Sequence, residues 1–109
     1  MLKKIFRLSN VKGVRAAKTF SSPFLIVKFS ENEEKQTRVA FVISKAVDKK
    51  AVIRNKLKRN LSIAVEENLT RIRQGYSIIF IAKPQILQID KEQQKEILKE
   101  ILKKAGLLK

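Results

Sequence analysis

One long amphipathic stretch, residues 51–73, constrains the fold more than any other part of the sequence. Apolar side chains recur in it at steps of three and four residues: Ile53, Leu57, Leu61, Ala64 or Val65, Leu69 and Ile72. This spacing predicts a helix with one buried face. Gly75 follows it, and because glycine commonly ends helices, we expect the helix to stop just before this residue.

Short runs of β-forming residues flank this helix. Residues 24–29 and 38–43 precede it and residues 76–82 follow it, which predicts three strands. The polar residues 31–36 predict a hairpin loop between the first two strands. Residues 38–43 carry apolar side chains on both faces, which indicates a central strand. Of the aromatic residues in these runs, Phe41 and Phe80 are expected in the core.

A second amphipathic helix is predicted over residues 91–104. Asp90 and Gln93 have the spacing of a capping box, and Gly106 stands where a C-terminal cap is expected. Residues 9–18 predict a short first helix, which Gly13 weakens, and residues 1–8 form a basic arm. We therefore expect one α+β domain over residues 1–109, with helices packed on a mixed sheet in two layers.

The charge balance favours a polyanionic partner. Lys and Arg number 25 against 10 Asp and Glu, a formal net charge of +15. Nucleic acid is the usual partner of such a domain, and an anionic membrane surface is the rival. The rival ranks lower, because the apolar face of the basic helix is needed by the core. No apolar run approaches the roughly 20 residues of a membrane span, so we expect a cytoplasmic protein.

Catalysis by the side chains of this chain is disfavoured. The sequence has no cysteine and no histidine, which excludes disulfides, thiolate-ligated metal and the common nucleophile pairs with histidine. Asp48 and Asp90 are far apart in the sequence and have no acidic neighbours at ligand spacing. We therefore predict no catalytic residue and no metal site formed by the protein alone.

A cluster of cations around the start of the long helix forms the candidate RNA-binding surface. Within residues 45–59 only Asp48 is acidic, and the candidate residues are Lys45, Lys49, Lys50, Arg54, Asn55, Lys56, Lys58 and Arg59. At about 100° per residue the helical members spread over the face opposite the apolar stripe. Phosphates favour such a face, because Arg and Lys release the counterions of the nucleic acid and Arg holds two phosphate oxygens.

The sequence around this cluster resembles the protein component of bacterial ribonuclease P. Residues 41–45 read Phe-Val-Ile-Ser-Lys, and residues 49–59 read Lys-Lys-Ala-Val-Ile-Arg-Asn-Lys-Leu-Lys-Arg. That family carries a strand ending in Ser-Lys, a short loop, Ala-Val, and a helix with an Arg-Asn-Arg motif and a Lys-Arg pair. The resemblance extends from about Phe20 to the last helix.

The resemblance implies a fold of order α-β-β-β-α-β-α, with a left-handed βαβ crossover like that of a ribosomal-protein second domain. It implies a protein that binds the catalytic ribonuclease P RNA, one monomer per RNA. The protein would also bind the 5′ leader of precursor tRNA and assist its endonucleolytic removal. The phosphodiester bond would be cut by the RNA with its bound magnesium ions.

The chain departs from the family pattern at several positions. Lys56 replaces the second Arg of the motif, which keeps the positive charge but loses the guanidinium that can hold two phosphate oxygens. Ser62 stands where another Arg is common. The first helix usually carries two Phe residues that face the leader, and Asn10 and Val14 fall near those positions. We therefore expect Phe20, Phe24 and Lys28 to line the leader cleft, with Lys45 close by.

Three other functions remain open from the sequence. The first alternative is a non-enzymatic RNA-binding or ribosome-associated protein of related fold. The second is a self-sufficient nuclease, which would need carboxylates that converge in space. The third is a DNA-compacting protein, which would bind duplex DNA of any sequence as tightly as structured RNA.

Overall fold

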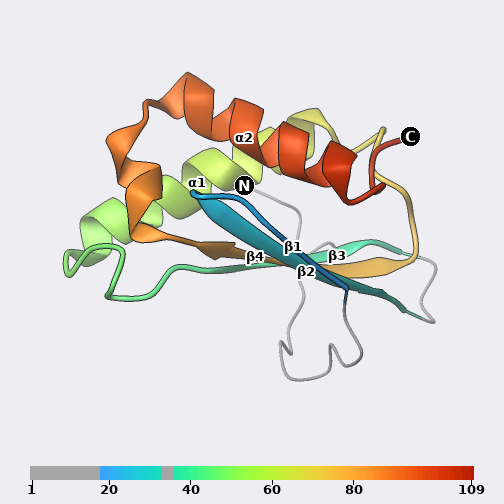
Figure 1. The fold of residues 1–109 in the computed structure, drawn as a ribbon, viewed down its shortest axis with the longest axis horizontal. Helices are drawn as coiled ribbons and strands as arrows, with labels where there is room; N and C mark the ends of the chain where they lie inside the picture. Colours follow the sequence, from blue (N-terminus) through green and yellow to red (C-terminus); the bar gives the residue numbers. More distant parts are fainter. Residues whose placement is uncertain (1–17, 33–35) are drawn as a thin grey trace.

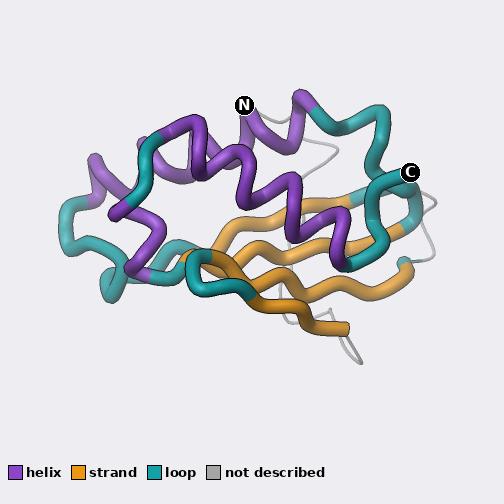
Figure 2. The backbone as a smooth tube through the Cα atoms, turned by 45° about the horizontal axis from the view of Figure 1, so that its top comes forward, coloured by secondary structure: helices purple, strands orange, loops and turns teal. Residues whose placement is uncertain are grey.

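The computed structural model describes residues 18–32 and 36–109, which form two layers: a four-stranded sheet and two helices on one of its faces (Figure 1). Figure 2 shows both helices on the same side of the strands. This arrangement confirms the expected α+β domain with a mixed sheet. The predicted basic arm and all but the last residue of the predicted first helix lie outside the described residues.

The sheet has the strand order β1-β2-β4-β3. β1 pairs antiparallel with β2, β2 pairs antiparallel with β4, and β3 pairs parallel with β4. The strands are β1 (Lys18–Ser21), β2 (Leu25–Glu31), β3 (Arg38–Val42) and β4 (Tyr76–Ala82). A parallel pair needs a long connection between its strands, and a helix supplies it here. The left-handed sense of this crossover stays a prediction.

The prediction that residues 38–43 form a central strand paired with residues 24–29 is wrong. β4 lies between β2 and β3, so β3 is an edge strand. Both β3 and β4 read as apolar on both faces, and such a pattern does not say which of them is central. The burial of β4 shows the difference, because Ser77, Ile78, Ile79 and Phe80 are all buried in it.

Three strands precede α1, as the order implied by the resemblance predicts. The residue pattern alone did not predict strand β1, because its four residues carry only one large apolar side chain. Phe20 lies opposite Val27 of β2 and so faces the helices. The turn between the two strands depends on Ser22. Its hydroxyl accepts the N–H groups of Phe24 at 3.2 Å and of Leu25 at 3.0 Å. The serine and the following Pro23 were the local signals of this turn.

The long helix, α1 (Ala51–Glu67), is shorter than predicted. The Asn68 side chain donates to the Ala64 carbonyl at 2.8 Å. In a continuing helix this carbonyl would accept the backbone N–H of Asn68, so the side chain competes with the helix here. Leu69 and Ile72 extended the apolar spacing, but they lie in the turns that follow. Ile72 is buried there and pairs with Leu108 of the C-terminal tail. Gly75, with a φ of 85°, lies just before β4 and does not end the helix.

The last helix, α2 (Lys91–Lys104), matches its predicted bounds. Asp90 accepts the Gln93 N–H at 2.8 Å and the Gln93 side chain accepts the Asp90 N–H at 3.1 Å, which confirms the capping box. Gly106, with a φ of 75°, follows the helix end as expected. A 3-10 helix that the sequence did not predict, η3 (Pro84–Gln88), connects β4 to α2.

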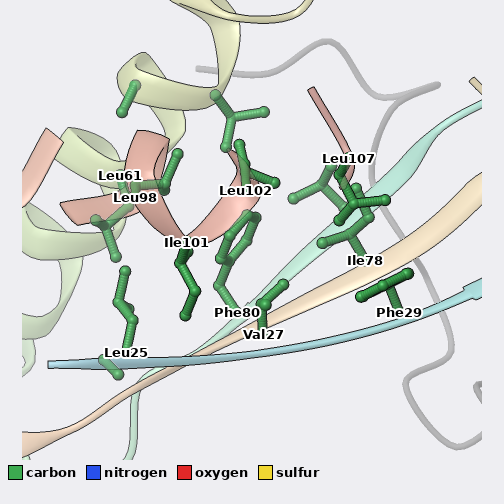
Figure 3. Close-up of a cluster of buried hydrophobic side chains, with 14 of the residues drawn as sticks. Leu25, Val27, Phe29, Leu61, Ile78, Phe80, Leu98, Ile101, Leu102 and Leu107 are labelled. Atoms are coloured by element: carbon green, nitrogen blue, oxygen red, sulfur yellow. The ribbon is translucent and has the colours of Figure 1, made fainter. Parts of the chain in front are cut away.

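The hydrophobic core fills the space between the helices and one face of the sheet (Figure 3). Alternate residues of β2 and β4 point into it from the sheet, and apolar residues of α1 and α2 cover them. The labelled members in Figure 3 are Leu25, Val27, Phe29, Leu61, Ile78, Phe80, Leu98, Ile101, Leu102 and Leu107. Phe41 packs against this core and stacks on Phe80 at 5.5 Å between ring centroids, so the core assignment of both is confirmed.

Two valines of α1 provide a matched test of this packing. Val65 is fully buried, whereas Val52 is 76% exposed. Val65→Ala is expected to lower the free energy of unfolding by roughly 2 kcal/mol, because it removes buried methyl groups and leaves a cavity. Val52→Ala should change it by no more than about 0.5 kcal/mol. Denaturant unfolding measures both, and equal effects of the two substitutions would contradict the placement of α1 on the sheet.

Candidate nucleic-acid interface

The basic helix α1 is positioned by the loop that connects it to β3. Val47 is buried and anchors this loop in the core, and its N–H donates to the Ser44 carbonyl at 3.0 Å. Asp48 accepts the Lys50 N–H at 2.8 Å and so shapes the start of the helix. Lys45, Lys49 and Lys50 are exposed on the loop. The structure therefore brings the loop cations next to those of the helix.

The outward face of α1 carries four of the five predicted RNA-binding residues that lie in this helix. Leu57, Leu61, Ala64 and Val65 turn toward the core and are buried. The exposed predicted residues of the helix are Asn55, Lys56, Lys58 and Arg59. We call the exposed set Lys45, Lys49, Lys50, Asn55, Lys56, Lys58 and Arg59 the basic face. The predicted division of the helix into an apolar and a cationic side is confirmed for these residues, with Arg54 as the exception.

Arg54 lies differently from the rest of the predicted set. It is half-buried, at the edge of the core side of the helix, and its Nε is buried without a hydrogen-bond partner among the described residues. By helical rotation its side chain starts between those of Leu61 and Val65. Arg54 is therefore not counted in the basic face.

Ser62 is not part of the basic face either. It is 2% exposed, and its hydroxyl donates to the Lys58 carbonyl at 2.8 Å, one helical turn earlier. The family pattern has a charged residue here. In this chain the position is a buried structural one.

The charges of α1 run against its helix dipole. Lys49 and Lys50 stand at its N-terminus, its first turn has no acidic residue, and no described side chain caps it. Glu66 and Glu67 stand at its C-terminus. The helix dipole disfavours a charge of this sign near a helix end by about 0.3–1 kcal/mol, because it favours acids in the first turn and bases in the last. Glu67 also forms an ion pair with Lys95 of α2 at 3.1 Å. α2 follows the favourable order, with Glu92 in its first turn and Lys103 and Lys104 in its last.

The three residues expected to line a leader cleft do not share a face of the sheet. Phe20 and Phe24 are half-buried and pack against the core, and Phe20 stacks on Phe29 at 6.1 Å. Lys28 is exposed and lies on the opposite face, because it alternates with the buried residues Val27 and Phe29 along β2. The expectation of one cleft lined by all three residues is therefore corrected. The pairing of β1 with β2 places Phe20 on the core side of the sheet, and Lys28 lies on the other side.

Lys28 lies on the face of the sheet opposite the helices, where its neighbours are small and aliphatic side chains. Lys28 is paired with Ile79 of β4, and Ile79 with Ala40 of β3. Ile79 is 3% exposed, whereas Ile26, Ala40, Val42 and Ile81 are half-buried. We call this surface, defined by Ile26, Lys28, Ala40, Val42 and Ile81, the open face. Strand alternation was the sequence signal that could have separated Lys28 from the two phenylalanines.

The described part of the chain offers no metal centre of its own. In residues 18–32 and 36–109, no group of three or more Asp, Glu, His or Cys side chains is arranged to hold a metal ion. Asp48 lies in the loop before α1, and Asp90 is occupied in capping α2. Over the same ranges, no helix is long and apolar enough to cross a membrane.

Comparisons with known proteins agree with this arrangement. The family model for ribonuclease P matches residues 2–106. The ribonuclease P protein component of Caldanaerobacter subterraneus is 30% identical over 107 residues, 97% of this chain and 91% of the relative. The corresponding protein of Alkaliphilus oremlandii is 32% identical over 97 residues, 89% of this chain and 84% of the relative.

Solved structures share the fold. A Staphylococcus aureus ribonuclease P protein, a mutant described as defective in mRNA degradation activity, superposes with a TM-score of 0.90 at 23% identity, covering 96% of this chain and 92% of that one. The Thermotoga maritima ribonuclease P protein superposes with a TM-score of 0.74 at 26% identity, covering 82% and 84%. With the family match over nearly its whole length, this chain belongs to the family of ribonuclease P protein components, whose role is RNA binding in precursor tRNA processing.

Proposed function

We propose that the basic face docks on the catalytic ribonuclease P RNA while the open face holds the 5′ leader of precursor tRNA. The observation that carries this proposal is the charge order of α1, with lysines just before its N-terminus and glutamates at its C-terminus, an order that the helix dipole disfavours. A purely structural helix gains from the opposite order, as α2 does. Cations kept at an uncapped helix N-terminus suit a phosphate ligand, which also meets the free N–H groups there.

The open face suits a single-stranded leader. Four of its five defining residues are half-buried aliphatic side chains, and the fifth, Lys28, is an exposed cation. Apolar side chains can contact any of the four bases, and the lysine can contact the phosphate backbone of the leader. Such a surface binds single-stranded RNA without selecting its base sequence. Lys45 lies just after the carboxyl end of β3 and is exposed. It can add a positive charge between Lys28 and the cations of α1. Phe20 and Phe24 are left out of this proposal because they pack against the core.

The division of labour between protein and RNA follows from the chemistry of the chain. It has no histidine or cysteine, and its described carboxylates form no metal-holding group. We infer that the RNA and its magnesium ions cut the phosphodiester bond, and that the protein binds and positions. One copy per RNA and a cytoplasmic location stay predictions.

The central experiment mixes the purified protein with a bacterial ribonuclease P RNA at low magnesium and adds precursor tRNA. The expected result is faster removal of the 5′ leader than with the RNA alone, since the protein neutralises phosphates that magnesium otherwise screens. A rate equal to that of the RNA alone would falsify the proposal. Cleavage by the protein without RNA would favour a self-sufficient nuclease.

The basic face has a testable salt dependence. The double variant Lys58→Ala with Arg59→Ala removes two exposed cations from α1. It should reduce the slope of log affinity against log salt by roughly 1.4 to 1.8, at about 0.7–0.9 per lost phosphate contact. Affinity for the catalytic RNA is measured by filter binding from low to high salt.

The matched control removes two charges elsewhere. Lys103→Ala with Lys104→Ala changes the net charge equally but lies in the last turn of α2. This control should leave the slope within about 0.3 of the wild type. Equal slope changes in both double variants would show that net charge alone, and not the basic face, determines binding.

The helix cap gives a test in which stability and function move in opposite directions. Lys50 occupies the N-cap position in an extended conformation, with φ −78° and ψ 119°. Lys50→Asp should raise the free energy of unfolding by roughly 0.5–1 kcal/mol, because it caps α1 and complements the dipole. The same change should weaken RNA binding roughly tenfold or more at low salt, because it reverses a charge on the basic face.

Lys50→Ala is the control for this substitution. It removes the same cation without adding a cap, so it should weaken RNA binding less and give no gain in stability. Thermal unfolding and RNA titration are measured on all three proteins. If Lys50→Asp binds the RNA as tightly as the wild type, the N-terminus of α1 is not at the interface.

A further inference from the structure

A pocket of about 330 Å³ lies beside the basic face, between α1, η3 and the start of α2. Its position follows from the sheet: β3 and β4 are parallel, so the segments that leave their carboxyl ends meet at the same end of the molecule (Figure 1). One of these segments leads into α1 and the other is η3. Ile53, Ile63 and Leu87 give the pocket apolar walls.

Cations border these apolar walls. Lys56 and Arg59 of α1 and Lys91 of α2 all line the pocket and are exposed. Two of them belong to the basic face, so the pocket continues the surface proposed for RNA. The third comes from a different helix, which places positive charge on both sides of the opening.

Two buried side-chain amides line the pocket, and one of their oxygens is an unsatisfied acceptor that lies beneath the pocket surface. Asn60 and Gln94 both line it and are 7% and 8% exposed. Gln94 donates to the carbonyls of Ile86 at 2.9 Å and Ile89 at 3.2 Å and accepts the Asn60 Nδ2 at 2.8 Å. The Asn60 Nδ2 also lies 3.3 Å from the Lys91 carbonyl. The Asn60 Oδ1 is buried and has no hydrogen-bond partner among the described residues.

An unsatisfied buried acceptor is unfavourable, and a partner from outside the chain is one way to satisfy it. The hydrogen bonds between Asn60 and Gln94 determine which atom of the Asn60 amide has no partner. Because the Gln94 amide is committed on both sides, the Asn60 Nδ2 is held toward it, and the Asn60 Oδ1 is left as the acceptor. A ligand here should therefore carry an N–H donor on a planar, partly apolar body.

We propose that this pocket takes one unstacked nucleobase of the RNA bound at the basic face. The volume lies at the lower end of the range for ligand pockets, roughly 300–1,000 Å³, which suits a nucleoside and not a larger group. The base packs on the aliphatic walls, while Lys56, Arg59 and Lys91 hold the flanking phosphates. A shift of the Asn60 side chain on binding exposes its Oδ1 to an N–H of the base. Unstacked bases are the usual target of protein recognition in structured RNA. This inference rests on the proposed function and adds a base contact to it.

A purely apolar ligand fits the observations less well. It would leave the Asn60 acceptor unsatisfied and would give the three cations no partner. A free phosphate or another small anion would use the cations alone and leave the apolar walls empty. A nucleotide matches the walls, the acceptor and the charge together.

Nuclear magnetic resonance titrations of the whole protein with adenosine, adenosine monophosphate and inorganic phosphate test the pocket without the RNA. Adenosine and its monophosphate should shift the side-chain amide signals of Asn60 and Gln94 and the backbone signals of Ile63 and Leu87. Inorganic phosphate should shift only the signals of the lysines and arginines around the opening. If phosphate and the monophosphate shift the same signals and Asn60 does not respond, the pocket is only an anion site and the inference is overturned.

A variant pair then tests the pocket with the catalytic RNA. Leu87 is 37% exposed, so Leu87→Ser can remove an apolar wall with little effect on folding, which thermal unfolding checks. It should lower RNA affinity by roughly fivefold or more, as loss of a base contact does. The salt slope should stay unchanged, because no phosphate contact is lost. Gln88→Ala alters an exposed neighbour that does not line the pocket, and should keep affinity within about twofold.

The outcomes separate this inference from the proposed function. If Leu87→Ser binds the RNA like the wild type while wild-type protein still speeds leader removal, the base pocket is refuted and the proposed function stands. If the wild type does not speed leader removal, the proposed function is refuted. The nucleotide titration still decides the pocket in that case, because it uses no catalytic RNA.

Discussion

Strand β4 is hydrogen-bonded along both of its edges, antiparallel to β2 and parallel to β3, and the remaining structure depends on this double pairing. Its helix-facing residues Ile78 and Phe80 form the floor of the core on which α1 and α2 pack. The parallel pairing with β3 also requires α1 to lie in the connection between the two strands. The same contact that closes the core thus places the basic helix on the sheet.

The two helices show how stability and binding compete within one small domain. α2 has a capping box, an acid in its first turn and lysines in its last, so every end effect stabilises it. α1 has none of these and carries cations where the dipole disfavours them. Burial of Leu57, Leu61 and Val65 offsets this cost, because an apolar side chain buried in the core contributes more than a surface charge near a helix end. The core therefore permits α1 to present charges that suit a polyanion.

The loops that leave the carboxyl ends of β3 and β4 carry several of the candidate binding residues. The loop after β3 delivers Lys45, Lys49 and Lys50, and the 3-10 helix after β4 delivers Leu87 beside α1. Because parallel strands end at one edge, these segments converge although they are far apart in the sequence. The basic face, proposed to dock on the RNA, and the pocket, proposed to hold one of its bases, thus lie at the same end of the molecule.

The sequence by itself determined the cationic side of α1, the bounds of α2 with its capping box, and the strand at residues 76–82, because each depends on local spacing and local hydrogen bonds. It did not determine that β4 lies between β2 and β3, since two strands apolar on both faces are interchangeable by pattern. It also did not place Phe20, whose direction depends on the pairing of β1 with β2, or the pocket, whose walls come from three elements. Pairing partners and convergent surfaces are set by long-range packing, which only the tertiary structure decides.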